Sequence, residues 1–304
     1  MNTTKRRASA LAGLTLLAAC GGAPNTLQSQ RDAVVARNAP LREASLAPIR
    51  AANVGGKPLI RYVHERTAYV LDGATSMETV PGPSPGTLVF GGMADGKVVT
   101  REIGTATALT DDGYFVTAAH CVSTGRALLI RTTPGRPPRE SEAVVVWSGR
   151  DAEPAIDVAV LWAPGLAGPG FTWSPDDVTK GATLLCSGSG ARGLPVAGGT
   201  FVERDATGHV LTIEAPLLPG DSGGPCVLAD GTLLGVCSTV AVTEDTPVGT
   251  VVRPDTSWLA DLVQRDRTER ASAAQPKARL TTAGMLRATA IDAEIDRLAG
   301  PAGR

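Results

Sequence analysis

The pattern of apolar and polar positions changes near residue 87 of the chain and again near residue 265. Between these points, short apolar runs alternate with turn residues such as Asp112-Gly113 and Asp230-Gly231. Short runs bounded by such turns are typical of strands in all-β domains. The predicted strands are 87–90, 97–102, 114–117, 127–131, 143–147, 158–162, 183–186, 210–214, 225–228 and 232–237. Because helices do not alternate with these strands, the pattern favours an antiparallel barrel or sandwich.

The segments on either side have a different pattern. Residues 20–86 are polar, Ala-rich and interrupted by Pro and Gly, which predicts a partly disordered spacer with a strand or two in 60–71. Residues 257–264 predict a short helix. The tail 266–304 is charged and Ala-rich, and 282–298 has the apolar spacing of an amphipathic helix. We expect a marginal helix or a disordered tail there; a helix that docks on a partner is the alternative.

The first nineteen residues predict an export signal. A cluster of Lys5, Arg6 and Arg7 precedes an apolar stretch, 8–19, that is too short to span a bilayer comfortably. The stretch ends in Leu-Ala-Ala-Cys-Gly, which resembles the cleavage box of bacterial lipoproteins. The resemblance implies that Cys20 is lipidated and anchors the protein to a membrane of the cell envelope, on its periplasmic or extracellular face. An ordinary signal peptide or an apolar N-terminal helix is the alternative.

Composition narrows the classes of function. The 29 Lys and Arg nearly balance the 30 Asp and Glu, so no charge excess points to a nucleic-acid partner. Besides Cys20 the chain has four cysteines, and export would place them where disulfides persist. Two bridges among four cysteines have three possible connectivities. With no close cysteine pair and only three histidines, we expect no metal site, and we expect no cofactor.

Three segments carry residues suited to nucleophilic catalysis. They read Thr-Ala-Ala-His-Cys around His120, Ala-Ile-Asp-Val-Ala around Asp157 and Pro-Gly-Asp-Ser-Gly-Gly-Pro around Ser222. A serine hydroxyl becomes a good nucleophile when an imidazole takes its proton, and a carboxylate fixes the tautomer of that imidazole. The glycines beside Ser222 permit a tight turn that points backbone N–H groups at a developing oxyanion. The three segments together predict acyl-transfer chemistry.

These segments resemble the signatures of the trypsin/chymotrypsin superfamily of serine proteases, and the resemblance covers roughly 87–265. It implies an all-β fold of two six-stranded antiparallel β-barrels with a short C-terminal helix. It also implies that His120 is the general base and then acid, that Asp157 orients it and that Ser222 is the nucleophile. Asp151 is the alternative to Asp157 as the carboxylate.

The resemblance extends to the groups that bind substrate. It implies an oxyanion hole formed by the N–H groups of Gly220 and Ser222. The run 214–220 is also similar to the corresponding segment of the HtrA/Deg periplasmic proteases. The backbone after Ser238, which would lie beside the triad aspartate, is expected to pair with a substrate strand.

The residues at the implied specificity pocket depart from trypsin. Pro216 occupies the pocket base and is followed by Leu217, so no carboxylate is present to pair with a substrate Arg or Lys. Val240 stands at the pocket wall, where it would narrow the entrance. We therefore expect cleavage after small or medium apolar residues.

The cysteines and the activation residues depart as well. The resemblance implies a bridge between Cys186 and Cys226, with Cys121 and Cys237 left free. In many relatives a newly freed N-terminus pairs with the aspartate before the nucleophile, which is Asp221 here. A cation such as Arg192, or a terminus freed by cleavage near 90–92, could serve instead.

The sequence therefore predicts a serine endopeptidase that acts on proteins or peptides through an acyl-enzyme. The alternative is a catalytically inactive, protease-like lipoprotein that serves as a binding module. Esterase chemistry would use the same three side chains. It is disfavoured because the strand-to-helix Gly-x-Ser-x-Gly context is missing around Ser222.

Overall fold

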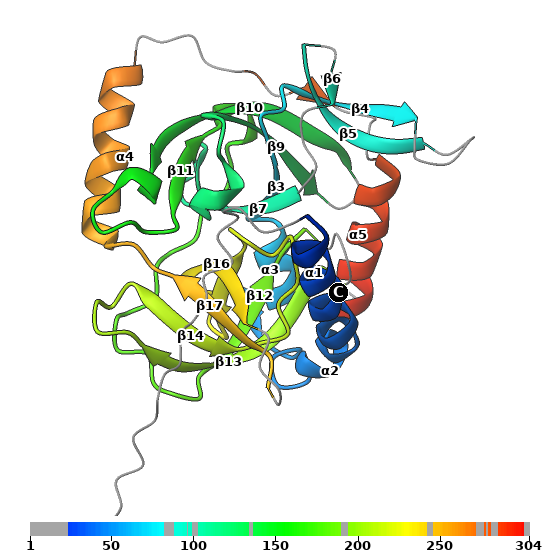
Figure 1. Ribbon diagram of the computed structural model, residues 1–304. Helices are drawn as coiled ribbons and strands as arrows, with labels where there is room; N and C mark the ends of the chain where they lie inside the picture. The colour runs from blue at the N-terminus through cyan, green and yellow to red at the C-terminus, as the bar shows by residue number, and fades with distance from the viewer. Residues whose placement is uncertain are drawn as a thin grey trace, which may run out of the picture.

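A computed structural model describes residues 24–81, 88–95, 97–98, 103–133, 136–189, 194–241, 246–271, 277, 279–280 and 285–300. Two β-barrels lie one above the other, with α4 against the upper barrel and α1, α2, α3 and α5 gathered on the opposite side of the molecule (Figure 1). The expected signal, with Cys20, and Arg192 lie outside the described residues.

The elements follow in chain order. The helices, with the short 3-10 turns written as η, are α1 (Pro24–Asn38), η1 (Ala39–Leu41), α2 (Arg42–Ser45), α3 (Leu59–His64), η2 (Ala119–Cys121), η3 (Gly149–Asp151), η4 (Pro164–Leu166), α4 (Thr256–Arg270) and α5 (Met285–Ala299). The strands are β1 (Asn53–Val54), β2 (Lys57–Pro58), β3 (Thr67–Asp72), β4 (Ser76–Pro81), β5 (Leu88–Ala94), β6 (Lys97–Val98), β7 (Ile103–Ala108), β8 (Tyr114–Thr117), β9 (Arg126–Thr133), β10 (Arg136–Ser148), β11 (Ala159–Trp162), β12 (Thr183–Ser187), β13 (Val196–Arg204), β14 (Val210–Glu214), β15 (Pro225–Leu228), β16 (Leu233–Ala241), β17 (Val248–Val252) and β18 (Arg279–Leu280).

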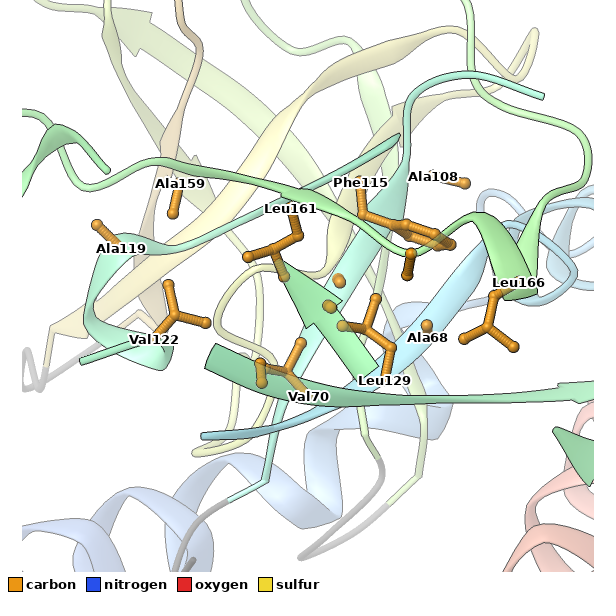
Figure 2. Close-up of a cluster of buried hydrophobic side chains, with 14 residues drawn as sticks. Ala68, Val70, Ala108, Phe115, Ala119, Val122, Leu129, Ala159, Leu161 and Leu166 are labelled. Carbon is orange, nitrogen blue, oxygen red and sulfur yellow. The ribbon is translucent and has the colours of Figure 1, made fainter. Parts of the chain in front are cut away.

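The first barrel consists of β11, β8, β7, β3, β9 and β10 in that order. It closes because β10 also pairs with β11, and β18 adds one short antiparallel pairing on β10. Its interior is filled by Phe115, Leu129 and Leu161 together with several buried alanines, whose small side chains leave room for the larger ones (Figure 2). The outer faces of β8 and β11 are covered by α4, through contacts of Tyr114 and Val160 with the helix side chains.

The second barrel closes in the order β12, β13, β14, β17, β16 and β15, with β15 returning to β12. Buried aliphatic side chains and three cysteines form its core. The two barrels meet through a small valine cluster, in which Val116 and Val158 of the first contact Val236 and Val252 of the second. The all-β fold of two six-stranded antiparallel barrels with a short C-terminal helix is thus confirmed.

The region upstream of residue 87 is more ordered than a spacer. Of the strand or two expected in 60–71, the structure has one, β3, and the first half of the segment forms helix α3 instead. Leu59, Ile60 and Val63 in α3 are buried at helical spacing, which explains the helix. β3 lies between β7 and β9 as an integral strand of the first barrel. The domain boundary at 87 remains a prediction, but part of the barrel lies upstream of it.

Two strands of the second barrel lie outside the predicted runs. β17 carries a glycine at its second position, and β13 contains the adjacent pair Gly198 and Gly199. Glycine interrupts the alternation of apolar and polar residues, so the sequence pattern was weak there. Gly199 has no room for a side chain, because an added Cβ would lie 2.6 Å from the carbonyl oxygen of Glu214.

The helices after the second barrel pack on the chain itself. The helix expected at 257–264 is present as the longer α4. In the tail, the amphipathic spacing corresponds to α5, whose Ile291, Ile295 and Leu298 are buried in a cluster with residues of α3 and the second barrel. Among the described helices, none has both the length and the apolar character needed to cross a membrane.

Candidate active site

The three predicted triad residues come from both barrels. His120 lies in η2, directly after β8, and Asp157 lies two residues before β11, so the first barrel supplies both. Ser222 lies in the loop between β14 and β15 of the second barrel, and Ser238 lies in β16. The candidate site therefore lies where the two barrels meet.

His120 and Asp157 form a two-point contact. The ring Nδ1 of His120 lies 2.8 Å from one carboxylate oxygen of Asp157, and the backbone N–H of His120 donates to the other oxygen at 3.0 Å. Burial by itself lowers the pKa of His120, but the hydrogen bonds and charges of Asp157 and Cys121 together outweigh it and raise that pKa to about 10. This contact leaves Nε2 as the ring nitrogen that could exchange a proton with a nucleophile.

Ser238 connects this pair to the nucleophile loop. Its hydroxyl donates to Asp157 Oδ2 at 2.5 Å, and its carbonyl oxygen accepts a hydrogen bond from Ser222 Oγ at 3.1 Å. Burial raises the pKa of Asp157, but the hydrogen bonds from His120 and Ser238 more than offset this, so the pKa lies below 3.8. The carboxylate is therefore ionised at neutral pH, as the orienting role requires.

The Ser222 side chain is half-buried and points toward β16. Its hydroxyl donates to the carbonyl oxygen of Ser238. Among the hydrogen bonds between described residues, none joins Ser222 to the His120 ring. Its carbonyl oxygen accepts from the N–H of Thr105 at 2.9 Å. Rotation about the Cα–Cβ bond of Ser222 would therefore be needed for a proton to pass from the hydroxyl to the imidazole. Apo hydrogen bonds at catalytic sites commonly tighten only when substrate binds.

The loop around Ser222 is a tight turn that is hydrogen-bonded to the first barrel. Gly220 and Gly223 have φ angles of 104° and 80°, which only glycine adopts readily. A Cβ at Gly223 would lie 2.0 Å from the carbonyl oxygen of Thr105. Two threonines of β7 hold the loop by hydrogen bonds to its backbone. Thr105 Oγ1 donates to Gly220 O at 2.7 Å, and Thr107 Oγ1 donates to Gly223 O at 2.9 Å.

The turn leaves two backbone donors available. Among the hydrogen bonds between described residues, neither the N–H of Gly220 nor that of Ser222 donates to a protein acceptor. Two unused N–H groups two residues apart, beside a serine hydroxyl, can stabilise an oxyanion. These are the two residues predicted to form the oxyanion hole.

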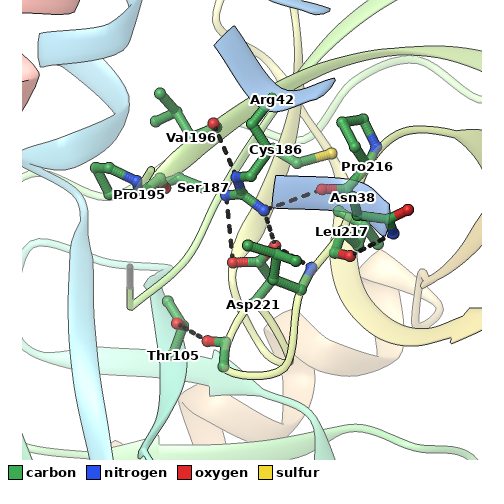
Figure 3. Close-up of polar contacts among 12 residues, drawn as sticks. Asn38, Arg42, Thr105, Cys186, Ser187, Pro195, Val196, Pro216, Leu217 and Asp221 are labelled. Carbon is green, nitrogen blue, oxygen red and sulfur yellow. Dashed lines mark hydrogen bonds and ion pairs between the residues drawn. The ribbon is translucent and has the colours of Figure 1, made fainter. Parts of the chain in front are cut away.

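The cation that contacts Asp221 among the described residues is Arg42 of α2. Arg42 Nη1 lies 2.5 Å from Asp221 Oδ2, and both side chains are buried (Figure 3). Arg192, the cation suggested by the sequence, lies outside the described residues. Arg42 lies 179 residues away in sequence. No local motif marks it, because its segment resembles an ordinary polar spacer, so only the fold could reveal the contact.

The predicted pocket residues lie along the same loop and on β16. Pro216 and Leu217 are buried, and Leu217 packs in the core of the second barrel. Their carbonyl groups accept hydrogen bonds from Arg42 and Asn38. Val240 is partly buried against the same core. The role of these residues in substrate preference stays a prediction.

The cysteines of the second barrel are close together but reduced. Cys186 and Cys226 face each other across β12 and β15, with their sulfurs 3.3 Å apart, yet all four described cysteines are free thiols. The predicted Cys186–Cys226 bridge is therefore absent from the structure, although the barrel brings its two ends together. Cys237 is buried in the same core, and Cys121 contacts the carbonyl oxygen of Ser222 at 3.6 Å.

Three other titratable residues considered in the sequence, Asp151, His64 and His209, do not contact these side chains. Asp151 is exposed in η3, and Asp157 is the carboxylate that contacts His120. His64 is buried against Asp292 and Thr132, and His209 contacts a backbone carbonyl. Within the described ranges, no group of three or more His, Cys, Asp or Glu side chains is arranged to hold a metal ion.

Comparison with known families finds a match for the part of the chain that contains the candidate site. Residues 104–236 match the family model of the trypsin-like peptidase domain. The matched stretch runs from β7 to β16 and contains His120, Asp157 and Ser222. The chain is thus similar to this family over the matched stretch, and the resemblance to trypsin-like serine proteases with HtrA features is confirmed.

One curated relative is the probable periplasmic serine endoprotease DegP-like of Halomonas elongata. It is 28% identical over 148 residues, which cover 46% of this chain and 30% of the relative. The match thus spans less than a third of the relative's length. Similar solved structures include the serine endoprotease from Yersinia pestis, with a TM-score of 0.49 at 20% identity, covering 70% of this chain and 66% of that one. The active form of the Rv3671c protease from M. tuberculosis has a TM-score of 0.46 at 21% identity, covering 72% and 86%.

Proposed function

We propose that this protein is a serine endopeptidase with His120, Asp157 and Ser222 as its catalytic triad. The observation that carries the proposal is the hydrogen-bonded array from His120 through Asp157 and Ser238 to Ser222, which draws residues of two barrels into one site. The match of residues 104–236 to the family model of the trypsin-like peptidase domain supports it.

In the proposed reaction, Ser222 Oγ attacks the carbonyl carbon of a peptide bond while His120 Nε2 accepts the hydroxyl proton. The Asp157 carboxylate stabilises the imidazolium that forms, and the N–H groups of Gly220 and Ser222 bind the oxyanion. His120 then gives its proton to the leaving amine. Water, deprotonated by the same imidazole, hydrolyses the acyl-enzyme and returns the serine hydroxyl. The array of donors around Asp157 keeps this carboxylate ionised throughout.

The proposed substrates are proteins or peptides with a small or medium apolar residue before the cleaved bond. The buried Pro216 and Leu217 support this preference, because neither offers a charge to a basic side chain. Comparing kcat/KM for Val or Ala peptides with kcat/KM for Arg peptides tests it, and an Arg preference would contradict it.

We further propose that the protein is exported and held at the cell envelope by a lipid on Cys20. The periplasmic description of the Halomonas elongata relative supports export of this chain. The sequence around Cys20 supports the anchor. A single acyl-anchored cysteine would keep the protease at a membrane surface, close to envelope protein substrates.

The experiment that tests the proposed hydrolase uses a fluorophosphonate probe, which reacts with activated serine nucleophiles. We expect the wild type to be labelled, and Ser222→Ala to lose both labelling and peptide hydrolysis, with kcat reduced by at least about 10⁴-fold. Ser257→Ala, at an α4 serine outside the site, should label like the wild type. A folded wild type that remains unlabelled would favour the inactive binding lipoprotein instead.

A further inference from the structure

Arg42 is a buried arginine from the N-terminal segment whose guanidinium contacts the nucleophile loop. Its side chain is fully buried, and that of Asp221 is 4% exposed. Nη1 lies 2.5 Å from Asp221 Oδ2, and Nη2 lies 3.4 Å from Oδ1, so the guanidinium faces both carboxylate oxygens (Figure 3). Asp221 directly precedes Ser222 and directly follows Gly220 in the chain.

The same guanidinium also donates to the backbone on either side. Nη1 donates to the carbonyl oxygen of Pro216 at 3.1 Å, and Nε donates to that of Val196 in β13 at 3.2 Å. The Asp221 carboxylate also accepts a hydrogen bond from within the loop, because the N–H of Leu218 donates to Oδ2 at 2.8 Å. One side chain thus holds both ends of the loop 216–221 and joins it to a barrel strand.

The loop conformation depends on this charge pair. A Cβ at Gly188 would lie 2.0 Å from Asp221 Oδ1, so the carboxylate occupies a tightly enclosed space against the second barrel. A buried carboxylate without a partner carries a large desolvation penalty. Without Arg42, Asp221 would move toward water, and the peptide groups of Gly220 and Ser222 on either side of it would move with it.

The segment that carries Arg42 is docked specifically on the second barrel. Ser45 Oγ accepts a hydrogen bond from the N–H of Gly198 at 2.9 Å, and a Cβ at Gly198 would lie 1.9 Å from the Ser45 carbonyl oxygen. Asn38 donates to the carbonyl of Leu217 at 2.8 Å, and Leu46 is fully buried. The backbone of the segment therefore approaches β13 more closely than any residue but glycine would allow.

We propose that Arg42 is a positioning residue of the proposed hydrolase, which holds the loop 216–221 so that the N–H groups of Gly220 and Ser222 face the oxyanion. The docked segment 38–46 supplies, from within the intact chain, the positive charge that the loop requires. Activity then needs no chain cleavage near residues 90–92. This inference rests on the proposed serine-hydrolase function.

The test measures the rate of fluorophosphonate labelling and the fraction of protein finally labelled, in the full chain below its unfolding temperature. We expect Arg42→Met to be labelled at least about 100-fold more slowly than the wild type, as for loss of an oxyanion donor. With a peptide substrate, the loss should lie in kcat, with KM changed by less than about threefold. The final labelled fraction should stay near that of the wild type. A merely structural role would instead reduce that fraction and leave the rate of the folded molecules unchanged.

Two further variants keep the test decisive. Arg50→Met, four residues beyond the docked segment and at an exposed position, should label at the wild-type rate. Arg42→Met/Asp221→Asn leaves no buried unpaired charge, so it should fold even if Arg42→Met does not, and it should still label at least about tenfold more slowly than the wild type. Wild-type labelling rates in folded Arg42→Met or in the double variant would overturn the positioning role. An unlabelled wild type would instead refute the hydrolase function on which it rests.

Discussion

The Asp157 carboxylate is held in place by several hydrogen bonds rather than by one. Three donors, the ring and backbone N–H of His120 and the hydroxyl of Ser238, surround its carboxylate. Hydrogen bonds to an ionised group contribute more than those between neutral partners, so the array stabilises the charge. The same charge stabilises the imidazolium of His120, which gives the site a specific pH dependence.

The first residue-scale prediction concerns the protonation of His120. Its raised pKa means that its pairing with Asp157 stabilises the fold fully below pH 6.5, and that this contribution is lost as pH rises through the raised value. Activity should change in the opposite direction, because a general base must be neutral. We expect the ascending limb of kcat/KM against pH to have its midpoint above 6.5.

Proton NMR titration of the three histidines in Ser222→Ala would check this directly. The His120 signal should titrate above pH 6.5, and Asp157→Asn should lower its midpoint because the carboxylate is removed. A His120 midpoint at or below 6.5 in the Ser222→Ala protein would contradict the prediction.

At the residue scale, the residues of the candidate site were easier to predict from the sequence than the residues that support it. His120, Asp157 and Ser222 lie in contiguous motifs, so each could be assigned from its neighbours. Arg42 could not, because it meets Asp221 only after the second barrel has folded and carries no motif of its own. A Cys186–Cys226 bridge was predicted, and the structure has the two sulfurs 3.3 Å apart as free thiols; oxidation depends on redox conditions as well as on position.

Elements with regular patterns were predictable, and those interrupted by glycine or assembled over long sequence distances were not. β8, β14 and β15 match the predicted runs residue for residue, because each is a short apolar run between turns. A strand was expected in 60–71, but the spacer-like composition around it gave no sign that β3 belongs to the first barrel. The β13 pattern was broken by its two glycines, although these are the residues that permit the close approach of Ser45.

At the scale of elements, α4 allows a clean test of helix capping. Asp255 precedes the helix, and its Oδ1 accepts hydrogen bonds from the N–H groups of Ser257 and Trp258 at 2.8 and 3.0 Å. These contacts satisfy two of the donors that every helix start leaves unpaired. We expect Asp255→Ala to lower Tm by roughly 2–4 °C, the shift typical of a lost cap in a domain of this size, and to leave kcat/KM unchanged.

The control for the cap is Asp261→Ala, an exposed position inside the same helix. Alanine favours helix there, so its Tm should be equal to or above that of the wild type. Differential scanning calorimetry compares the two variants. Equal melting temperatures for Asp255→Ala and Asp261→Ala would contradict the capping role.

Helices from the N-terminal and C-terminal parts of the chain pack against each other. α5, near the C-terminus, packs against α3, from the segment before the first barrel, and Ile295 is fully buried in their shared cluster. His64 of α3 also contacts Asp292 of α5 at 2.9 Å. The apolar spacing in the tail was visible in the sequence, but the surface that it covers was not.

We therefore predict that Ile295→Ala destabilises the whole protein. Deleting a fully buried isoleucine side chain to alanine removes apolar burial and leaves a cavity, which typically costs about 2–5 kcal/mol. Urea unfolding of the full chain should show the loss. Asp296→Ala, whose side chain is 47% exposed, is the neighbouring control and should change stability by less than about 1 kcal/mol. Unchanged unfolding of Ile295→Ala would mean that α5 contributes little to the stable core.

The position of β3 has a consequence for how much of the chain the first barrel needs. Because this strand is hydrogen-bonded to β7 on one side and β9 on the other, a fragment starting at residue 87 would lack one strand of the first barrel. Two unsatisfied strand edges would then face solvent, and such edges recruit other chains. Proteolytic removal of the chain up to that point would thus yield an aggregation-prone remnant rather than a smaller, stable double barrel.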